Sequence, residues 1–147
     1  MNEILYILMR NDLPSMNAGK AMAQASHASN QFIKNFHERK EVQEWERSTP
    51  DGFGTVLVLS ATIDDINKLL HESVIGTGIP AQRVIDPSYP YRVNKEIANL
   101  INVERDSIPR VVNGDTVNLW RNETTCAFVF GTKETCVTLI GHLPLHP

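Results

Sequence analysis

An uncharged apolar run near the start of the chain, followed by an alanine-rich segment, most constrains the fold. Residues 4–9 (ILYILM) are too few for a helix of their own and carry no charge, which is typical of a central strand buried on both faces. A polar turn at 10–17 follows, and then a run rich in alanine extends to Phe36. Because alanine favours helix and allows close approach to a sheet, the order predicts a strand followed by a packed helix. Asn17 suits the N-cap of that helix.

A second strand and helix follow, and then a third strand. Residues 55–61 form another apolar, β-branched run. Thr62 and Asp65 then give an acidic variant of a capping box at the start of a helix. A short third strand is predicted at 81–86. Such strand–helix–strand units predict an α/β protein with three layers, helix, sheet and helix, and a mixed, mostly parallel sheet of about four strands.

The rest of the chain has a weaker pattern. Turn-forming residues predict loops or breaks at 87–91, 107–109 and 113–115. Asn94 is expected to cap a short helix that carries residues 97–101. Residues 116–120 and 124–130 are expected to pair as a hairpin across 121–123. A last short helix is predicted at 133–140.

Size and composition favour one globular domain over residues 1–147. The formal net charge of −3 counts against a general nucleic-acid-binding protein, which usually carries a basic excess. A local basic face remains open, since four basic residues lie on or just after the first helix: Lys20, Lys34, Arg39 and Lys40. Cys126 and Cys136 have no metal-ligand spacing. No apolar run approaches the length of a membrane span, and we expect a soluble, cytoplasmic protein.

Three polar side chains share one face of the alanine-rich helix. Lys20, Gln24 and His27 are spaced four and three residues apart. Lys20 falls in the first turn, where its charge adds to free backbone N–H groups and strengthens a site for anions. Taken one by one, these residues are better explained as a solvated lysine, a surface glutamine and a satisfied histidine. Together, after a glycine and above a strand end, they favour a site.

A carboxylate at the predicted end of the third strand could complete this site. Ligands of parallel sheets bind outside the C-terminal ends of the strands, so Asp86 could meet Lys20 there. Such a pair could polarise water, with each charge stabilising the other. A turn carboxylate before Pro87 is the alternative interpretation of Asp86.

Motifs at the two ends of the chain resemble one enzyme family. Arg10-Asn11-Asp12-Leu13, Gly19-Lys20, Ala23-Gln24 and His27-Ala28 are similar to the opening of the type-2 peptidyl-tRNA hydrolases, and Gly141-His142-Leu143 is similar to their close. The resemblance covers about the first 35 and the last 25 residues. It implies the α/β fold of that family and hydrolysis of the ester between a peptide and the terminal ribose of tRNA.

The resemblance also implies roles for individual residues. Four would be catalytic, with Lys20 stabilising negative charge, Asp86 orienting the water, Thr124 hydrogen-bonding the substrate or the water, and His27 matching the family's helix histidine. Four would bind substrate: Asp12, Gly19, Gln24 and His142. No metal or cofactor is implied. The partner would be peptidyl-tRNA, and a homodimer is a further expectation.

The chain departs from the family pattern around the expected pocket. Pro90 stands where the family has a threonine, and a segment within 88–122 looks inserted. Two other functions therefore remain open. One is a non-catalytic domain of the same fold that binds RNA or protein. The other is a small α/β protein with a different chemistry, although the chain lacks a Walker loop, a dinucleotide glycine fingerprint and a nucleophile elbow.

Overall fold

The computed structural model describes residues 3–74, 78–94, 96 and 107–147. The chain divides into two compact units. The first unit comprises Met1–Val84 and Thr125–Pro147, and the second comprises Ile85–Thr124. The second unit nearly coincides with the 88–122 segment that looks inserted in the sequence. The expectation of a single domain stays a prediction.

The first unit is built on a mixed sheet whose centre is β1 (Glu3–Arg10). The strand order is β2 (Val56–Ala61), β1, β5 (Thr116–Thr132), β3 (Ala81–Asn94). β1 pairs in parallel with β2 and antiparallel with β5. The prediction of a mixed α/β sheet is confirmed, but the expectation that it is mostly parallel is wrong, because β5 runs antiparallel beside β1. Among the described residues the sheet has five strands, close to the predicted number of about four.

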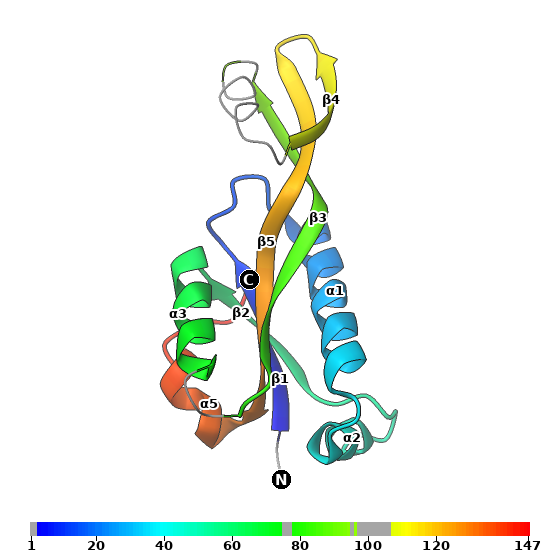
Figure 1. Cartoon of the computed structure of the whole chain (residues 1–147), viewed down its shortest axis with the longest axis vertical. Helices are drawn as coiled ribbons and strands as arrows, with labels where there is room; N and C mark the ends of the chain where they lie inside the picture. The colour runs from blue at the N-terminus through cyan, green and yellow to red at the C-terminus, as the bar shows by residue number, and fades with distance from the viewer. Residues whose placement is uncertain (1–2, 75–77, 95, 97–106) are drawn as a thin grey trace. The chain divides into compact units, whose positions relative to one another are not determined.

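Helices cover both faces of this sheet, which confirms the three predicted layers (Figure 1). One face carries α1 (Ala18–Phe36) and α2 (Lys40–Arg47), and the other carries α3 (Ile63–Val74) and α5 (Lys133–Ile140). β1 supplies both cores because successive side chains of a strand point to opposite faces. Leu5, Ile7 and Met9 join the α1 side, while Tyr6 and Leu8 join the α3 side.

Phe32 lies at the centre of the core beneath α1. Its side chain is fully buried, and its ring packs on four other aromatic rings, those of Phe36, Trp45, Phe128 and Phe130. Trp45 is held in this cluster by a hydrogen bond from Nε1 to the carbonyl oxygen of Thr55 at 3.0 Å. A Cβ atom on Gly54 would lie 2.0 Å from the Trp45 ring, so the chain needs glycine there.

The predicted helix starts are confirmed by side-chain hydrogen bonds. Asn17 Oδ1 accepts from the backbone nitrogen of Lys20 at 2.9 Å, which makes Asn17 the N-cap of α1. Thr62 and Asp65 form the predicted box, because each side chain accepts from the other residue's backbone nitrogen. These caps satisfy N–H groups that a helix leaves without intrahelical partners.

Three predictions about residues 87–130 are wrong. Residues 87–91 lie within β3 and not in a loop, and residues 107–109 begin β4 (Ser107–Asn113). β5 is one continuous strand, so the hairpin predicted across 121–123 is wrong. The turn predicted at 113–115 is confirmed and joins β4 to β5 antiparallel, with Gly114 at a φ of +62°. The short helix predicted over 97–101 lies outside the described residues.

Prolines in these strands explain why the sequence suggested loops. β3 stands at the end of the strand order, where a missing backbone N–H is tolerated, as for Pro87 and Pro90. Pro109 falls at the irregularity in the register between β4 and β5, a site at which proline is also accepted. The local composition is turn-like, but position in the sheet decides the conformation.

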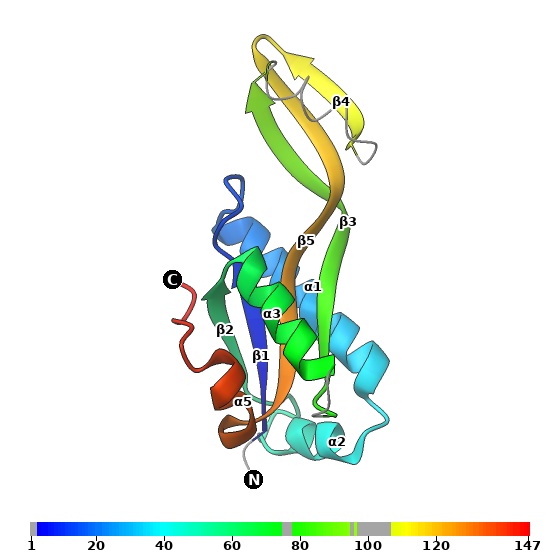
Figure 2. The same cartoon turned by 60° about the vertical axis from the view of Figure 1, so that its left-hand side comes forward.

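The C-terminal tail adds a feature that the sequence did not indicate. Residues 144–147 run along the outer edge of β2, as Figure 2 shows beside the C-terminus. The backbone nitrogen of Ser60 donates to the carbonyl of Pro144, and that of His146 donates to the carbonyl of Val58, both at 2.8 Å. The tail thereby pairs the polar backbone groups of an edge strand. Within the described residues no helix is long and apolar enough to cross a membrane.

Candidate functional site

The loop after β1 is tied to the start of α3 by a carboxylate. Arg10 Nε donates to Asp12 Oδ1 at 2.8 Å, and the backbone nitrogen of Ile63 donates to Asp12 Oδ2 at 3.1 Å. Partial burial alone would raise the pKa of Asp12. The hydrogen bonds from Arg10 and Ile63, with the charge of Arg10, outweigh that effect and hold this pKa below its ordinary value. Asp12 is therefore a structural anion between β1 and α3.

The same region brings together residues from the two ends of the chain. His142 Nε2 lies 3.8 Å from Asp65 Oδ1, and Asp65 belongs to the first turn of α3 that Asp12 also contacts. The Arg-Asn-Asp-Leu and Gly-His-Leu motifs thus meet at the N-terminus of α3. These contacts give Asp12 and His142 a structural role, and their part in substrate binding stays a prediction.

Lys20 projects from the first turn of α1 and is half-buried. Its Nζ donates to the backbone carbonyl of Ser15 at 3.0 Å, which fixes the ammonium over the loop after β1. Desolvation by burial lowers the pKa of this ammonium. No acidic residue lies in the first turn of α1, so the cation and the positive end of the helix reinforce each other. Gly19, beside it, is exposed.

Gln24 and His27 lie on the same helical face as Lys20 but differ in burial. Gln24 is only 3% exposed, and its Oε1 accepts a hydrogen bond of 2.7 Å from Thr125 Oγ1 of β5. His27 is exposed. One turn further along this face, Gln31 Nε2 donates to the carbonyl of Arg83 in β3 at 3.0 Å. The face that carries the three predicted residues is therefore directed towards β5 and β3.

Asp86 and Thr124 belong to the second unit. Asp86 lies inside β3 and not at its end, which corrects the prediction, because β3 continues to Asn94. Asp86 Oδ1 accepts a hydrogen bond of 2.8 Å from the backbone nitrogen of Ser88, which is compatible with the turn-carboxylate interpretation. Thr124 is half-buried in β5. The expected meeting of Asp86 with Lys20 stays a prediction.

Thr125 is a buried polar residue that the sequence interpretation does not select. The match to the family pattern selects its neighbour Thr124, whereas Thr125 is fully buried and contacts Gln24. The two partners are 101 residues apart, and no local sequence pattern connects them. To predict this contact from the sequence, one would need to know which residues of β5 face α1.

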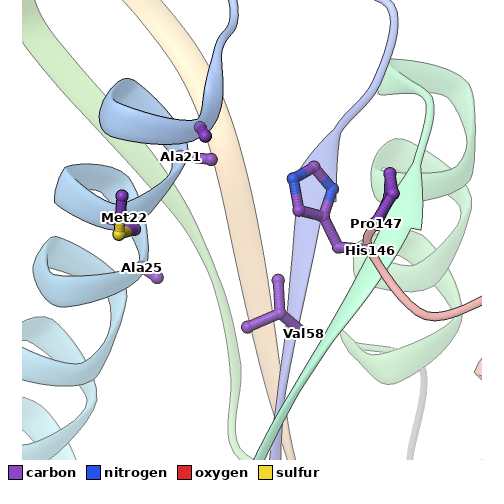
Figure 3. A pocket seen from close by; sticks show the side chains of 7 residues that line it. Ala21, Met22, Ala25, Val58, His146 and Pro147 are labelled. Atoms are coloured by element: carbon purple, nitrogen blue, oxygen red, sulfur yellow. The ribbon is translucent and has the colours of Figure 1, made fainter.

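Two cavities of about 300 Å³ each lie on the other flank of α1. Figure 3 shows the first cavity, with Met22 and Ala25 of α1 facing Val58 and His146. At about 100° per residue, Ala18 and Ala25 lie opposite Lys20 and His27 around the helix axis. The second cavity lies nearer the loop after β1 and is also lined by His146. Neither cavity is lined by the three predicted residues.

His146, which the sequence interpretation does not select, lines both cavities. Its Nδ1 is buried and has no hydrogen-bond partner among the described residues. In Figure 3 the ring lies beside Pro147, across the cavity from the labelled residues of α1. No group of three or more His, Cys, Asp or Glu side chains that could hold a metal ion occurs in the described part of the chain.

Comparison with known proteins identifies the family of the chain. The model of the family described as peptidyl-tRNA hydrolase PTH2 matches residues 4–99, which is more than half of the 147 residues. The chain belongs to this family. A search of curated proteins found no match. The predicted resemblance to type-2 peptidyl-tRNA hydrolases is thereby confirmed, and peptidyl-tRNA is the substrate at the level of the family.

Proposed function

We propose that this protein hydrolyses the ester bond between a peptidyl or N-blocked aminoacyl group and tRNA. The observation that carries the proposal is the half-buried Lys20, whose ammonium is fixed at the N-terminus of α1 by the carbonyl of Ser15. Membership of the PTH2 family supplies the substrate class. The reaction would take place in the cytoplasm, and the protein would act as a homodimer.

In the proposed reaction a water oxygen attacks the ester carbonyl carbon. Negative charge then develops on the carbonyl oxygen, and a fixed ammonium beside a helix N-terminus stabilises such charge without rearranging. The bond from the carbonyl carbon to the ribose oxygen breaks. The ribose oxygen takes up a proton, and the products are a free carboxylate and tRNA. A tRNA ester is already reactive, so positioning and charge stabilisation suffice.

The other predicted residues would act around Lys20. Asp86 would orient the attacking water or accept its proton, and Thr124 would hydrogen-bond the water or the substrate. Gln24 would donate an amide hydrogen to a substrate oxygen. His27, exposed at the same face, would contact the RNA end. The cation and donors suit an acyl ester flanked by phosphates.

A direct test measures release of an N-acetylated aminoacyl group from tRNA by the purified protein in the presence of a chelator. The wild-type protein should release the group, and Lys20→Ala should reduce the rate to the uncatalysed level. Lys34→Ala is a matched control, because Lys34 is an exposed lysine of the same helix and should keep full activity. A pure, folded wild-type protein that leaves the ester intact would contradict the proposal.

A non-catalytic RNA-binding domain is the second candidate. Pro90 favours it, because this residue has no hydroxyl where the family has one. In that case filter binding would detect a complex with tRNA while the ester stays intact. Binding and hydrolysis are therefore measured on the same preparation.

A further inference from the structure

The turn between β4 and β5 carries the only asparagine–glycine pair of the sequence, Asn113 and Gly114. It lies at the tip of the hairpin in the second unit (Figure 1). Asn113 ends β4 and is exposed, and Gly114 is the first residue of the turn. Asparagine is a thermolabile residue, because the next backbone nitrogen can attack its side-chain carbonyl and displace ammonia. Glycine in the next position favours this attack, since it has no side chain to shield the nitrogen.

The geometry of the turn leaves the backbone N–H of Gly114 available. Asn113 pairs with Thr116, so only two residues lie in the turn. The φ of Gly114 is +62°, and no residue other than glycine has a positive φ in the described part of the chain, which matches a type II′ turn. In such a turn the flanking residues share the ladder hydrogen bonds, and the N–H of the first turn residue lies outside them. Among the described residues this N–H has no hydrogen-bond partner.

A second pair with similar chemistry, Asp51 and Gly52, differs from the first in this respect. Aspartate before glycine can undergo the same ring closure, with loss of water in place of ammonia. The backbone nitrogen of Gly52, however, donates to the carbonyl of Thr49 at 3.1 Å. Gly52 also has a positive φ, and no atom lies within 4 Å of where a Cβ would stand on Gly52 or on Gly114. The hydrogen bond of the nitrogen is therefore what separates the two glycines.

We propose that Asn113 is a site of spontaneous modification, at which ring closure onto the backbone nitrogen of Gly114 converts the asparagine into aspartate or isoaspartate in the folded protein. The Gly114 nitrogen forms a bond to Asn113 Cγ and loses its hydrogen, and the side-chain amide leaves as ammonia. The product is a succinimide ring. Water then opens the ring at either of its two carbonyl carbons, and the two openings give aspartate and isoaspartate.

The two products have different effects on the hairpin. Both add one negative charge beside Asp115. Isoaspartate also adds one carbon atom to the main chain at the start of the turn. Because the register of a hairpin depends on the length of its turn, the pairing of Asn113 with Thr116 should be lost. The next pair joins Val112 to Val117, which is only 1% exposed, so we expect the opening to stop there.

The test incubates the purified full-length protein at pH 7, well below its unfolding temperature, and then digests it with trypsin. One tryptic peptide spans residues 111–121 and also contains Asn118. Asn113 should gain about one dalton, the mass change from amide to acid, whereas Asn118, a strand residue followed by leucine, should stay unchanged. Fragmentation by electron transfer separates the aspartyl from the isoaspartyl peptide. An Asn113 that stays intact while the urea-unfolded chain reacts would overturn the inference.

A variant shows whether the modified residue is Asn113. The added charge gives an acidic species that ion-exchange chromatography separates from the unmodified protein. This species should be absent from Asn113→Ser, because serine has no amide to lose. If the species forms in Asn113→Ser at the rate of wild type, then another residue is modified and the inference is wrong.

The comparison with Asp51 tests the structural reason for the choice of site. Rates at both residues are measured in the folded protein and in the urea-unfolded chain, so that the intrinsic difference between asparagine and aspartate cancels. Folding should leave the rate at Asn113 within about threefold of the unfolded chain, because exposed turns open at almost no cost. It should slow the reaction at Asp51 by a larger factor. Equal or stronger protection of Asn113 would overturn the role given to the free N–H of Gly114.

Discussion

The carboxylate of Asp12 accepts a hydrogen bond from the backbone nitrogen of Ile63, the first residue of α3, although the two residues are 51 positions apart. A loop that follows one strand thereby caps the helix that follows the neighbouring strand. Because β1 and β2 are parallel, the segments that leave their C-terminal ends start at the same edge of the sheet. The capping contact is a direct result of that arrangement.

The Asp12 contact predicts an acid-sensitive share of the folding free energy. Replacing Asp12 by alanine should lower the free energy of unfolding at pH 7 by about 1 kcal/mol, as expected for a lost helix cap. The pKa of Asp12 is lower in the folded protein than in the unfolded chain. Its contribution is therefore complete above the ordinary aspartate pKa and is lost as the pH falls through the folded value.

Urea denaturation of wild type and Asp12→Ala at pH 7 and at pH 3 measures this contribution. The difference between the two proteins should shrink at the acidic pH. Asp51→Ala is the control, because Asp51 is an exposed aspartate in a loop and should change little at either pH. A difference that stays constant or grows on acidification would contradict the assignment.

The lowered pKa of Lys20 predicts the alkaline limb of the pH–rate profile. Burial disfavours the ammonium, so the cation is lost at a lower pH than in a free lysine. If the ammonium stabilises the oxyanion, kcat should fall as the pH rises through that lowered pKa. Lys20→Arg keeps its charge to higher pH and should move the alkaline limb upward, whatever its absolute rate. Rates are measured after subtraction of uncatalysed ester hydrolysis. If the alkaline limb of the profile is unchanged in Lys20→Arg, then the limb reports the titration of another group.

The aromatic cluster around Phe32 predicts a large loss of stability on truncation. Phe32→Ala removes a fully buried ring that packs on four others, and such changes cost about 3–5 kcal/mol. Met22→Ala, in the same helix but 69% exposed, should change the free energy of unfolding by less than about 0.5 kcal/mol. Chemical denaturation compares the two, and similar values would mean that the core is packed differently.

Local patterns explain why much of the first unit could be predicted. The uncharged run at 4–9, the alanine-rich helix ending at Phe36 and the box of Thr62 with Asp65 are all encoded within a few residues. Each of these elements has the predicted type in the structure. Lys20, Gln24 and His27 could be grouped for the same reason, since helical spacing is a local property.

Contacts between distant residues explain what could not be predicted. Pro87 and Pro90 indicate a loop, and only their place at the end of the strand order shows that a strand can hold them. The contact between Thr125 and Gln24 joins residues that are 101 positions apart, so no local pattern indicates it. The position of the tail beside β2 likewise depends on backbone hydrogen bonds. The side chains of residues 144–147 show no pattern that indicates this pairing.

The unsatisfied nitrogen of His146 predicts a substitution that increases stability. Its Nδ1 is buried without a partner among the described residues, and such a group costs about 1–3 kcal/mol relative to a solvated one. His146→Leu fills a similar volume without a polar atom, beside Val58 and Ala21. It should therefore raise the free energy of unfolding by about 1 kcal/mol. The backbone hydrogen bond from residue 146 to Val58 does not depend on the side chain and should persist.

Thermal and urea denaturation of His146→Leu measure this gain against His142→Gln. His142 is the matched control, because its side chain is 59% exposed and its replacement should alter stability by less than about 0.5 kcal/mol. The cavity beside His146 lies on the flank of α1 opposite Lys20, so hydrolysis should be unaffected in His146→Leu. A destabilised His146→Leu would show that Nδ1 has a partner in solution, and a loss of hydrolysis would show that this flank takes part in substrate binding.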